Sequence, residues 1–193
     1  MGKVMADMSM TLDGFVGRPD GSDPGLHNWV FTGKVPFTIG GTTFHLTSVR
    51  SADFFREPIE NAGAVIVGNG SFRGMGENAL FQLPTFVLTH EDRAPIKQDG
   101  VPITFISDGI EAALKKAKAA AGKKAVYVFG GAKTVQQYLQ AGLLDELQVT
   151  VVPMLIGEGV RLFDCLTNAP IELEQIDVIE AENVTHFKYR VVK

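Results

Sequence analysis

The stretch AVYVFGGAKT, residues 125–134, decides the fold class of this chain. Its first five residues are all apolar, which is typical of a strand buried on both faces of a parallel sheet. Two glycines then lead into an expected helix that carries Val135, Tyr138 and Leu139 and stops near Gly142. A buried strand that passes directly into a helix predicts a protein of the α/β class.

A second junction of the same kind lies upstream, where the apolar residues 64–67 are followed by GNGSFR at 68–73. Two alternating runs, 171–180 and 184–192, predict an antiparallel pair at one end of the sheet. Further strands are expected at 4–12, 85–89, 103–106 and 147–152. We therefore expect a three-layer α/β fold, with a mainly parallel central sheet, antiparallel C-terminal strands and helices on both faces.

Two further helices are expected from apolar spacing and end signals. One begins after Ser107 or Asp108, which would cap it, and ends before Gly122. The other runs through residues 52–59 and should be interrupted or end near Pro58, because proline removes a helical hydrogen bond.

Residues 26–48 show no clear periodicity. Glycine and proline punctuate this segment at Gly33, Pro36, Gly40 and Gly41. It is therefore expected to be a loop, and a long irregular segment in a compact domain is more often functional than idle.

Composition limits the class of protein. With 193 residues, 45% apolar and 21% charged, the chain is expected to form one globular domain over residues 1–193. A net charge of −4 disfavours nucleic acid as the main partner. Cys165 is the single cysteine and the four histidines lack zinc-ligand spacing, so neither an internal disulfide nor a metal site is expected.

The apolar pattern also argues against a membrane partner. No apolar run reaches the roughly 20 residues that span a bilayer. Residues 1–7 lack the basic and apolar regions of a signal peptide. The chain is therefore expected to be cytoplasmic.

The two glycine junctions are the candidate binding elements. Glycine lets a phosphate approach the backbone closely, and the N–H groups of a helix start attract its charge. Lys133 and Thr134 add a cation and a hydroxyl to the second junction. Two such junctions in one small sheet could hold the two ends of a dinucleotide.

Two nucleotide-binding motifs offer alternative interpretations. Neither junction is a P-loop, because the Gly-Lys-Ser/Thr ending is missing. The first junction imitates a Rossmann fingerprint, with Gly68, Gly70, and Arg73 in place of the third glycine. Glu91 and Asp92 follow about 20 residues on, where that motif has its ribose-binding acid.

Several motifs together resemble the dihydrofolate reductase-like superfamily, and within it the group of the riboflavin biosynthesis reductase (C-terminal) domain. They are SMTLDG at 9–14, LHNW at 26–29, the turn at 68–72, VLTH at 87–90, Gly130-Gly131-Ala132, and the segment 142–163 with GLLDEL, VPMLIGEG and RLF. The last segment is the most specific. Their order and spacing cover nearly the whole chain.

The resemblance implies that NADPH lies across the carboxyl ends of the strands. The end of the first strand would lie beside the nicotinamide, both glycine junctions would hold the pyrophosphate, and residues 88–90 would border the adenosine. The residues that it assigns to the cofactor are Met10, Gly14, Gly68, Asn69, Ser71, Phe72, Thr89, His90, Gly130, Gly131, Ala132, Lys133 and Thr134.

One departure concerns the choice of dinucleotide. The family usually has an arginine after the glycine of its first turn to meet the 2′-phosphate, and this chain has Asn69 there. Arg73, His90 or Arg93 could substitute, whereas Glu91 and Asp92 would oppose the phosphate. NADH therefore stays open as an alternative.

A second departure concerns the proton donor. Dihydrofolate reductases carry an acid shortly after a loop tryptophan, but no Asp or Glu occurs between Pro24 and Ala52 around Trp29. Reduction of folate by the usual route is not expected. The proton would come from water, from the substrate, or from the catalytic candidates Asp13 and Glu158, while Trp29 is the candidate for contact with substrate.

These features predict an NAD(P)H-dependent reductase of a small, pterin- or pyrimidine-like molecule. The resemblance implies an activity like that of 5-amino-6-(5-phosphoribosylamino)uracil reductase, acting as a homodimer that pairs through the late strands. The alternative is a non-catalytic dinucleotide-binding protein that serves as a sensor or partner, which Asn69 and the missing acid keep open.

Overall fold

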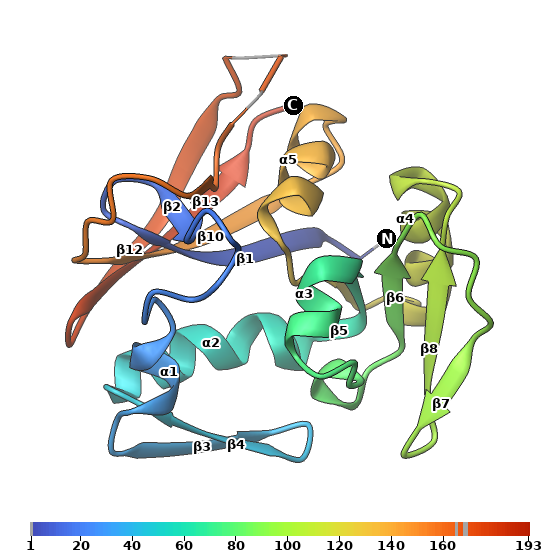
Figure 1. Ribbon diagram of the computed structural model, residues 1–193, viewed down its shortest axis with the longest axis horizontal. Coiled ribbons are helices and arrows are strands. Elements are labelled where there is room, and N and C mark those ends of the chain that lie inside the picture. The colour runs from blue at the N-terminus through green and yellow to red at the C-terminus, as the bar shows by residue number, and fades with distance from the viewer. Residues whose placement is uncertain (1, 165, 168–169) are drawn as a thin grey trace.

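The computed structural model describes residues 2–164, 166–167 and 170–193, and a nine-stranded sheet forms its centre (Figure 1). The strand order is β12-β13-β10-β1-β9-β5-β6-β8-β7. The five pairs from β10 to β8 are parallel, and the pairs that involve β12, β13 and β7 are antiparallel. The expected mainly parallel sheet with an antiparallel C-terminal pair at one end is confirmed. Cys165 lies outside the described residues.

The bounds of the elements are as follows. The strands of the main sheet are β1 (Val4–Thr11), β5 (Ala62–Gly68), β6 (Thr85–Leu88), β7 (Ile96–Gln98), β8 (Val101–Ile106), β9 (Ala125–Val128), β10 (Glu146–Val152), β12 (Leu173–Ala181) and β13 (Val184–Val191). The small sheets pair β2 (Phe15–Gly17) with β11 (Val160–Arg161) and β3 (Val35–Ile39) with β4 (Thr42–Leu46). The helices are α1 (Asn28–Phe31), α2 (Val49–Asn61), α3 (Asn69–Gly74), α4 (Ile110–Ala121), α5 (Ala132–Gln140) and the 3-10 turn Leu80–Gln82.

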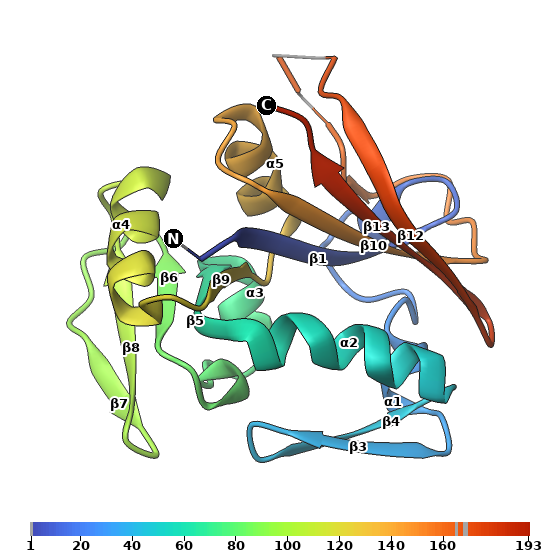
Figure 2. The same cartoon turned by 180° about the vertical axis from the view of Figure 1, so that it is seen from behind.

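Helices cover both faces of the sheet, which gives the three layers expected. One face packs on α4 and α5 through alternate strand residues such as Ala6, Ile66 and Val128. The residues between them, such as Met5 and Tyr127, face α2 and the β3–β4 hairpin. Figure 2 shows α2 and α5 on opposite sides of β1. Because successive side chains of a strand point to opposite faces of the sheet, every second residue reaches the same face.

Residues 26–48 are not a loop, so that expectation is wrong. They form α1 and a β-hairpin whose turn is Gly40-Gly41, with φ of +55° and +77°. These positive angles are those of a tight hairpin turn, for which glycine is the favoured residue. Phe37 and Phe44 of the hairpin pack against Phe55 of α2. The glycines therefore marked a turn between strands rather than irregular chain.

Two helix boundaries also differ from expectation. Neither Ser107 nor Asp108 caps α4, because the helix follows Gly109, whose φ of +93° suits glycine and which makes no side-chain cap. Pro58 does not end α2, which runs on to Asn61 and buries the proline against the core. The Ser48 hydroxyl accepts a hydrogen bond from the Ser51 N–H at 3.1 Å and so begins α2 earlier than expected.

In the part of the chain that the structure describes, no helix is long and apolar enough to cross a membrane.

Candidate functional site

The two glycine junctions meet in the structure. They follow the neighbouring parallel strands β5 and β9, and the Gly68 N–H donates to the Gly130 carbonyl at 2.8 Å. The Gly130–Gly131 peptide is cis, and Gly130 has a φ of +99°. A positive φ of this size is disfavoured for any residue with a Cβ, so glycine is required at Gly130.

Close side chains also require glycine at these junctions. A Cβ on Gly68 would lie 2.6 Å from the Thr134 hydroxyl oxygen, and one on Gly131 would lie 2.7 Å from that of Ser71. We call this cluster the double-glycine junction and define it as Gly68, Asn69, Ser71, Gly130, Gly131 and Thr134. Three of its residues lie at or just after the end of β5 and three follow β9; the two sets are about 60 residues apart in the chain but meet because these strands are neighbours in the sheet.

The double-glycine junction has the features that a dinucleotide requires. The Asn69 side-chain oxygen is buried and has no hydrogen-bond partner. A Cβ on Gly70 would meet nothing within 4 Å, so there is room at the start of α3. The N-terminus of α5 begins at the junction and carries the exposed Lys133. The N–H groups at the helix start can donate to a phosphate, and the orphaned Asn69 oxygen can accept a hydrogen bond from a sugar hydroxyl.

The residues expected at the adenosine end lie beyond β6. Thr89 is buried and its hydroxyl accepts from the Glu91 N–H at 3.1 Å, whereas His90 is exposed. Both arginines considered for the 2′-phosphate already have carboxylate partners. Arg73 donates to both Glu91 oxygens at 2.8 Å, and Arg93 donates to Glu77 at 2.8 Å.

The carboxylate of Asp13 holds a loop. It accepts from the Thr11 hydroxyl at 2.5 Å and from the N–H groups of Ile156 and Gly157 at 3.1 and 2.8 Å. The hydrogen bond from Thr11, followed by those from the loop, lowers the pKa of Asp13 below its ordinary value. An acid that is held ionised is a poor proton donor. Glu158 lies exposed in the same loop, and the catalytic roles of both acids stay predictions.

A polar row crosses the other face of the sheet, beneath α2. Lys188 of β13, Gln148 of β10 and Asp7 of β1 are register partners and so share this face. The amide of Gln148 is fully buried, and neither its oxygen nor its nitrogen has a hydrogen-bond partner. The Tyr127 hydroxyl donates to Asp7 at 3.3 Å. We call Asp7, Tyr127, Gln148 and Lys188 the α2-face row.

Asp7 was missed by the sequence reasoning. Burial raises its pKa from 3.8 to about 7, against smaller lowering effects from the Tyr127 hydrogen bond and from His27. Its side chain is only partly exposed. In the sequence Asp7 is a single acid in an alternating strand and looks like a solvent-facing residue. Only the fold shows its burial, and perturbed pKa values of this kind cluster at functional sites.

Trp29 lies mainly in the core beside this row. Its indole N–H donates to the Ser9 hydroxyl at 3.2 Å, and its ring packs edge-on against Phe55 and His186. His186 is fully buried between the hydroxyls of Ser51 and Thr150, and burial lowers its pKa to about 4. Trp29 is 5% exposed, so its contact with substrate stays a prediction.

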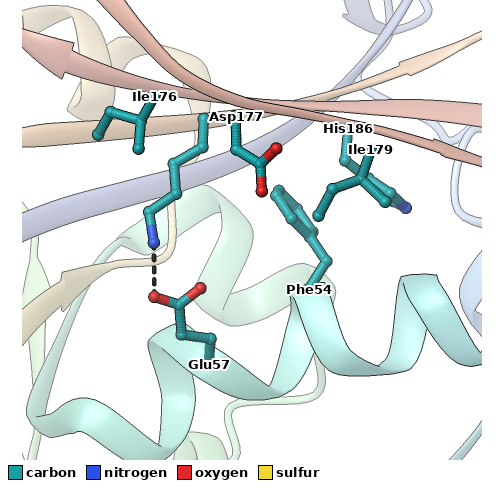
Figure 3. A pocket seen from close by; sticks show the side chains of 7 residues that line it. Phe54, Glu57, Ile176, Asp177, Ile179 and His186 are labelled. Carbon is teal, nitrogen blue, oxygen red and sulfur yellow. Dashed lines mark hydrogen bonds and ion pairs between the residues drawn. The ribbon is translucent and has the colours of Figure 1, made fainter.

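A cavity of about 280 Å³ lies at the outer end of the row, between α2 and the β12–β13 pair (Figure 3). The side chains of Glu57 and Lys188 form an ion pair of 2.5 Å at its wall, and His186 stacks on Phe54 at 4.3 Å. The cavity is lined by Phe54, Glu57, Ile176, Asp177, Ile179, His186 and Lys188. Within the described residues, no group of three histidine, cysteine or acidic side chains forms a metal site.

Comparison with known proteins gives one consistent family. The model of the RibD C-terminal domain family matches residues 2–187. The uncharacterized protein YwjB of Bacillus subtilis is 25% identical over 173 residues, which cover 86% of this chain and 85% of the relative. YyaP of the same organism is 26% identical over 167 residues, covering 83% and 80%.

Solved structures share the fold at low identity. A protein from Shewanella sp. PV-4, provisionally assigned to riboflavin biosynthesis, has a TM-score of 0.76 at 19% identity, with full coverage of both chains. Dihydrofolate reductase from Enterococcus faecalis complexed with NADP(H) has a TM-score of 0.65 at 17% identity, covering 100% of this chain and 98% of that one. The fold is therefore dihydrofolate reductase-like and is not the Rossmann fold that the fingerprint at residues 68–73 imitates.

The bifunctional diaminohydroxyphosphoribosylaminopyrimidine deaminase and 5-amino-6-(5-phosphoribosylamino)uracil reductase of Thermotoga maritima has a TM-score of 0.66 at 14% identity. The match covers 99% of this chain and 57% of that enzyme.

Proposed function

The chain belongs to the RibD C-terminal domain family, and from that premise we propose that it is an NAD(P)H-dependent reductase of a small pterin- or pyrimidine-like molecule. The reaction resembles that of 5-amino-6-(5-phosphoribosylamino)uracil reductase. The double-glycine junction is the observation that carries the proposal. It joins an orphaned buried acceptor, open space and a helix start at adjacent carboxyl ends of the sheet.

The residues of the chain would divide the work between binding and orientation. Ser71, Thr134 and the N-terminus of α5 would hold the pyrophosphate, and Asn69 would accept a hydrogen bond from the sugar. A bound reduced nicotinamide supplies a hydride, and the protein contributes the position of the reacting carbon. Met8 lies against Gly130, where a Cβ would meet its sulfur at 2.7 Å, so β1 runs directly beside the junction.

The choice between NADPH and NADH depends on two ion pairs. Glu91 holds Arg73 and Glu77 holds Arg93, so a 2′-phosphate must compete with a carboxylate for either cation. We propose NADPH as the cofactor, with one of these arginines turning to the phosphate, and NADH as the alternative.

The test is oxidation of NADPH and NADH by the full-length protein with 5-amino-6-(5-phosphoribosylamino)uracil and a panel of pterins, quinones, nitroaromatics and aldehydes. The proposal predicts acceptor-dependent loss of absorbance at the nicotinamide band. Tight binding of NADPH with no turnover of any acceptor would instead support the non-catalytic sensor or partner protein. Absence of binding to either nucleotide would contradict both.

We also propose that the protein is a homodimer that pairs through β12. This strand lies at the edge of the main sheet and exposes three apolar side chains. Leu173, Ile176 and Val178 are 40%, 41% and 42% exposed. Edge strands with exposed apolar residues are prone to pair with another chain. Light scattering should give twice 20.9 kDa, and Val178→Lys should give the monomer mass; a wild-type monomer would contradict the proposal.

A further inference from the structure

We propose that Asp7 is the acid that supplies the proton for the reduction, and that the amide of Gln148 positions the group that receives it. This inference rests on the proposed function and adds a catalytic residue to it. The geometry of the α2-face row, rather than any sequence motif, points to this carboxyl.

Asp7 lies where β1 passes the double-glycine junction. The next residue, Met8, points to the opposite face of the sheet and lies close to Gly130. A Cβ placed on Gly130 would be 2.7 Å from the Met8 sulfur. Asp7 itself faces α2, two residues before Ser9, which lies on the same face and accepts a hydrogen bond from the indole of Trp29. The carboxyl is therefore one residue away from the junction that would hold the cofactor, and on the face that carries the aromatic wall.

Gln148 provides an independent sign of a ligand on this face. Its side chain is fully buried beside Asp7, and both of its polar amide atoms have no partner. A buried unpaired amide costs free energy, and such groups in native proteins call for an explanation. A planar heterocycle with adjacent donor and acceptor atoms would satisfy the amide and bring its reacting group toward Asp7.

Other acids are less suited to donate a proton. Asp13 accepts two hydrogen bonds from the loop at 156–157 and one from the Thr11 hydroxyl, and these hold its pKa below the ordinary value. Glu158 is exposed, and residues 25–51, which surround Trp29, contain no acid. Among the described acids, Asp7 alone has a pKa raised to near neutrality, about 7, by burial.

The surroundings of Asp7 explain why its pKa is raised. Tyr127 of β9 donates to it, and His27, which precedes α1, adds an electrostatic effect; both favour the ionised form, but burial outweighs them. Gln148 of β10 is uncharged. Lys188 of β13 follows Gln148 along the row and pairs with Glu57 of α2.

The step balances with the reduced nicotinamide dinucleotide as the reductant. The carbon of a C=N or C=O group accepts the hydride and its two electrons, and the π pair moves to the nitrogen or oxygen. That atom forms a bond to the carboxyl proton of Asp7, whose O–H bond breaks. The products are the reduced substrate, the oxidised dinucleotide and the Asp7 carboxylate, which regains a proton from water.

The experiment measures the pKa of the Asp7 carboxyl and the rate of NADPH turnover in the same full-length protein. Carboxyl-¹³C-aspartate labelling gives one signal for each aspartate, and Asp7→Asn identifies the signal of Asp7. Turnover of NADPH is then followed from pH 5 to 9 with 5-amino-6-(5-phosphoribosylamino)uracil and the acceptor panel. Asp53→Asn, an exposed aspartate on α2, is the matched control.

The proposal predicts that Asp7 titrates near pH 7, and that the wild-type rate falls above that pH. Asp7→Asn should lower turnover by about 10²- to 10⁴-fold, the range for loss of a general acid. Its affinity for NADPH and the turnover of Asp53→Asn should stay at wild-type values. Gln148→Met should raise KM more than it lowers kcat, since this residue positions the substrate.

Each other outcome overturns the acid role in a distinguishable way. An Asp7 signal that titrates below pH 5, or an Asp7→Asn protein with wild-type turnover, removes Asp7 and leaves the reductase intact. NADPH binding by the wild type without turnover of any acceptor overturns both proposals together. Failure of the wild type to bind NADPH overturns the reductase, and the acid role falls with it.

Discussion

The double-glycine junction and the α2-face row lie on either side of the same strand, β1, yet they are built in opposite ways. The junction consists of two short runs of sequence whose glycines let backbone and hydroxyl groups approach one another. The row takes Asp7, Tyr127 and Gln148 from three strands that are far apart in the chain. The junction is locally encoded, whereas the row exists only through sheet register.

The two regions also differ in their effect on stability. In the junction the Gly68 N–H donates to the Gly130 carbonyl and the Thr134 N–H to the Gly131 carbonyl, and the Asn69 side-chain oxygen is buried without a partner. The row holds a desolvated carboxyl and an unpaired buried amide, both of which destabilise the fold. Residues that destabilise a fold without a structural reason are expected at functional sites. This difference supports the proposals that the junction binds the cofactor and that the row takes part in the chemistry.

The largest expected effect is a pH-dependent change in stability on removing Asp7. Its folded pKa of about 7 lies above the unfolded value of 3.8, so the folded state binds more protons between these values. The stability that Asp7 contributes is full below about pH 4 and is lost as the pH rises to about 7. At about 1.4 kcal/mol per pKa unit, the upper limit is about 4 kcal/mol, reduced by residual solvent contact.

Urea unfolding of the wild type and Asp7→Asn from pH 4 to pH 8 measures this effect. His186 acts in the opposite sense over an overlapping range, because its lowered pKa of about 4 costs stability as the pH falls below 6.5. Because His186 is present in both proteins, its effect cancels in the difference between their free energies of unfolding. That difference should favour Asp7→Asn increasingly up to pH 7. A difference that does not change with pH would show that Asp7 is not desolvated.

An intermediate effect is expected from two neighbouring substitutions on β10. Gln148→Met removes an amide without partners and should stabilise the fold by about 1–2 kcal/mol. Thr150→Val removes a hydroxyl that is bonded to His186 at 2.8 Å and should destabilise it by about 1–3 kcal/mol. Thermal unfolding of both proteins checks the opposite signs. Destabilisation of similar size in both would mean that Gln148 has a structural partner.

The smallest expected effect concerns cofactor choice at the junction side. Glu91→Gln breaks the 2.8 Å ion pair with Arg73 and leaves this arginine its longer pair with Glu77 at 3.7 Å, so the cation is held less tightly and is more available to a 2′-phosphate. Because exposed ion pairs contribute about 0.2–1 kcal/mol, the ratio of NADPH to NADH affinity should rise about 1.4- to 5-fold. Glu174→Gln frees Arg190 on the far edge strands and is the matched control. An equal rise of the affinity ratio in both variants would show that the loss of one negative charge, rather than the release of Arg73, causes the effect.

Most of the sheet was predictable because apolar runs of strand length carry their own signal. The buried strand before Gly130 and the alternating C-terminal runs appear in the structure as β9 and as the β12–β13 pair. The hairpin at residues 35–46 was mistaken for a loop because Gly40-Gly41 serves equally as loop or as tight turn, and only packing on α2 decides between them.

The candidate site was predictable to a smaller extent. Gly68, Gly130 and Thr134 come together as their motifs suggested. Asp7 did not stand out, because a single acid in an alternating strand looks like a solvent-facing position until the register places Gln148 beside it and α2 above it. Burial is a property of the whole fold, so no local pattern could have shown the raised pKa.

The most direct measurement of the central claim is a titration of NADPH into the wild type and three variants, followed by nicotinamide fluorescence. Gly131→Asp puts a carboxylate at the junction, beside Ser71, and should weaken binding by at least about 100-fold through size and like charge. Asp7→Asn should bind as the wild type does. Gly74→Asp, where a Cβ meets nothing within 4 Å, controls for added charge on α3. Loss of binding in Asp7→Asn, or unchanged binding in Gly131→Asp, would contradict the division of the molecule into a binding junction and a chemical row.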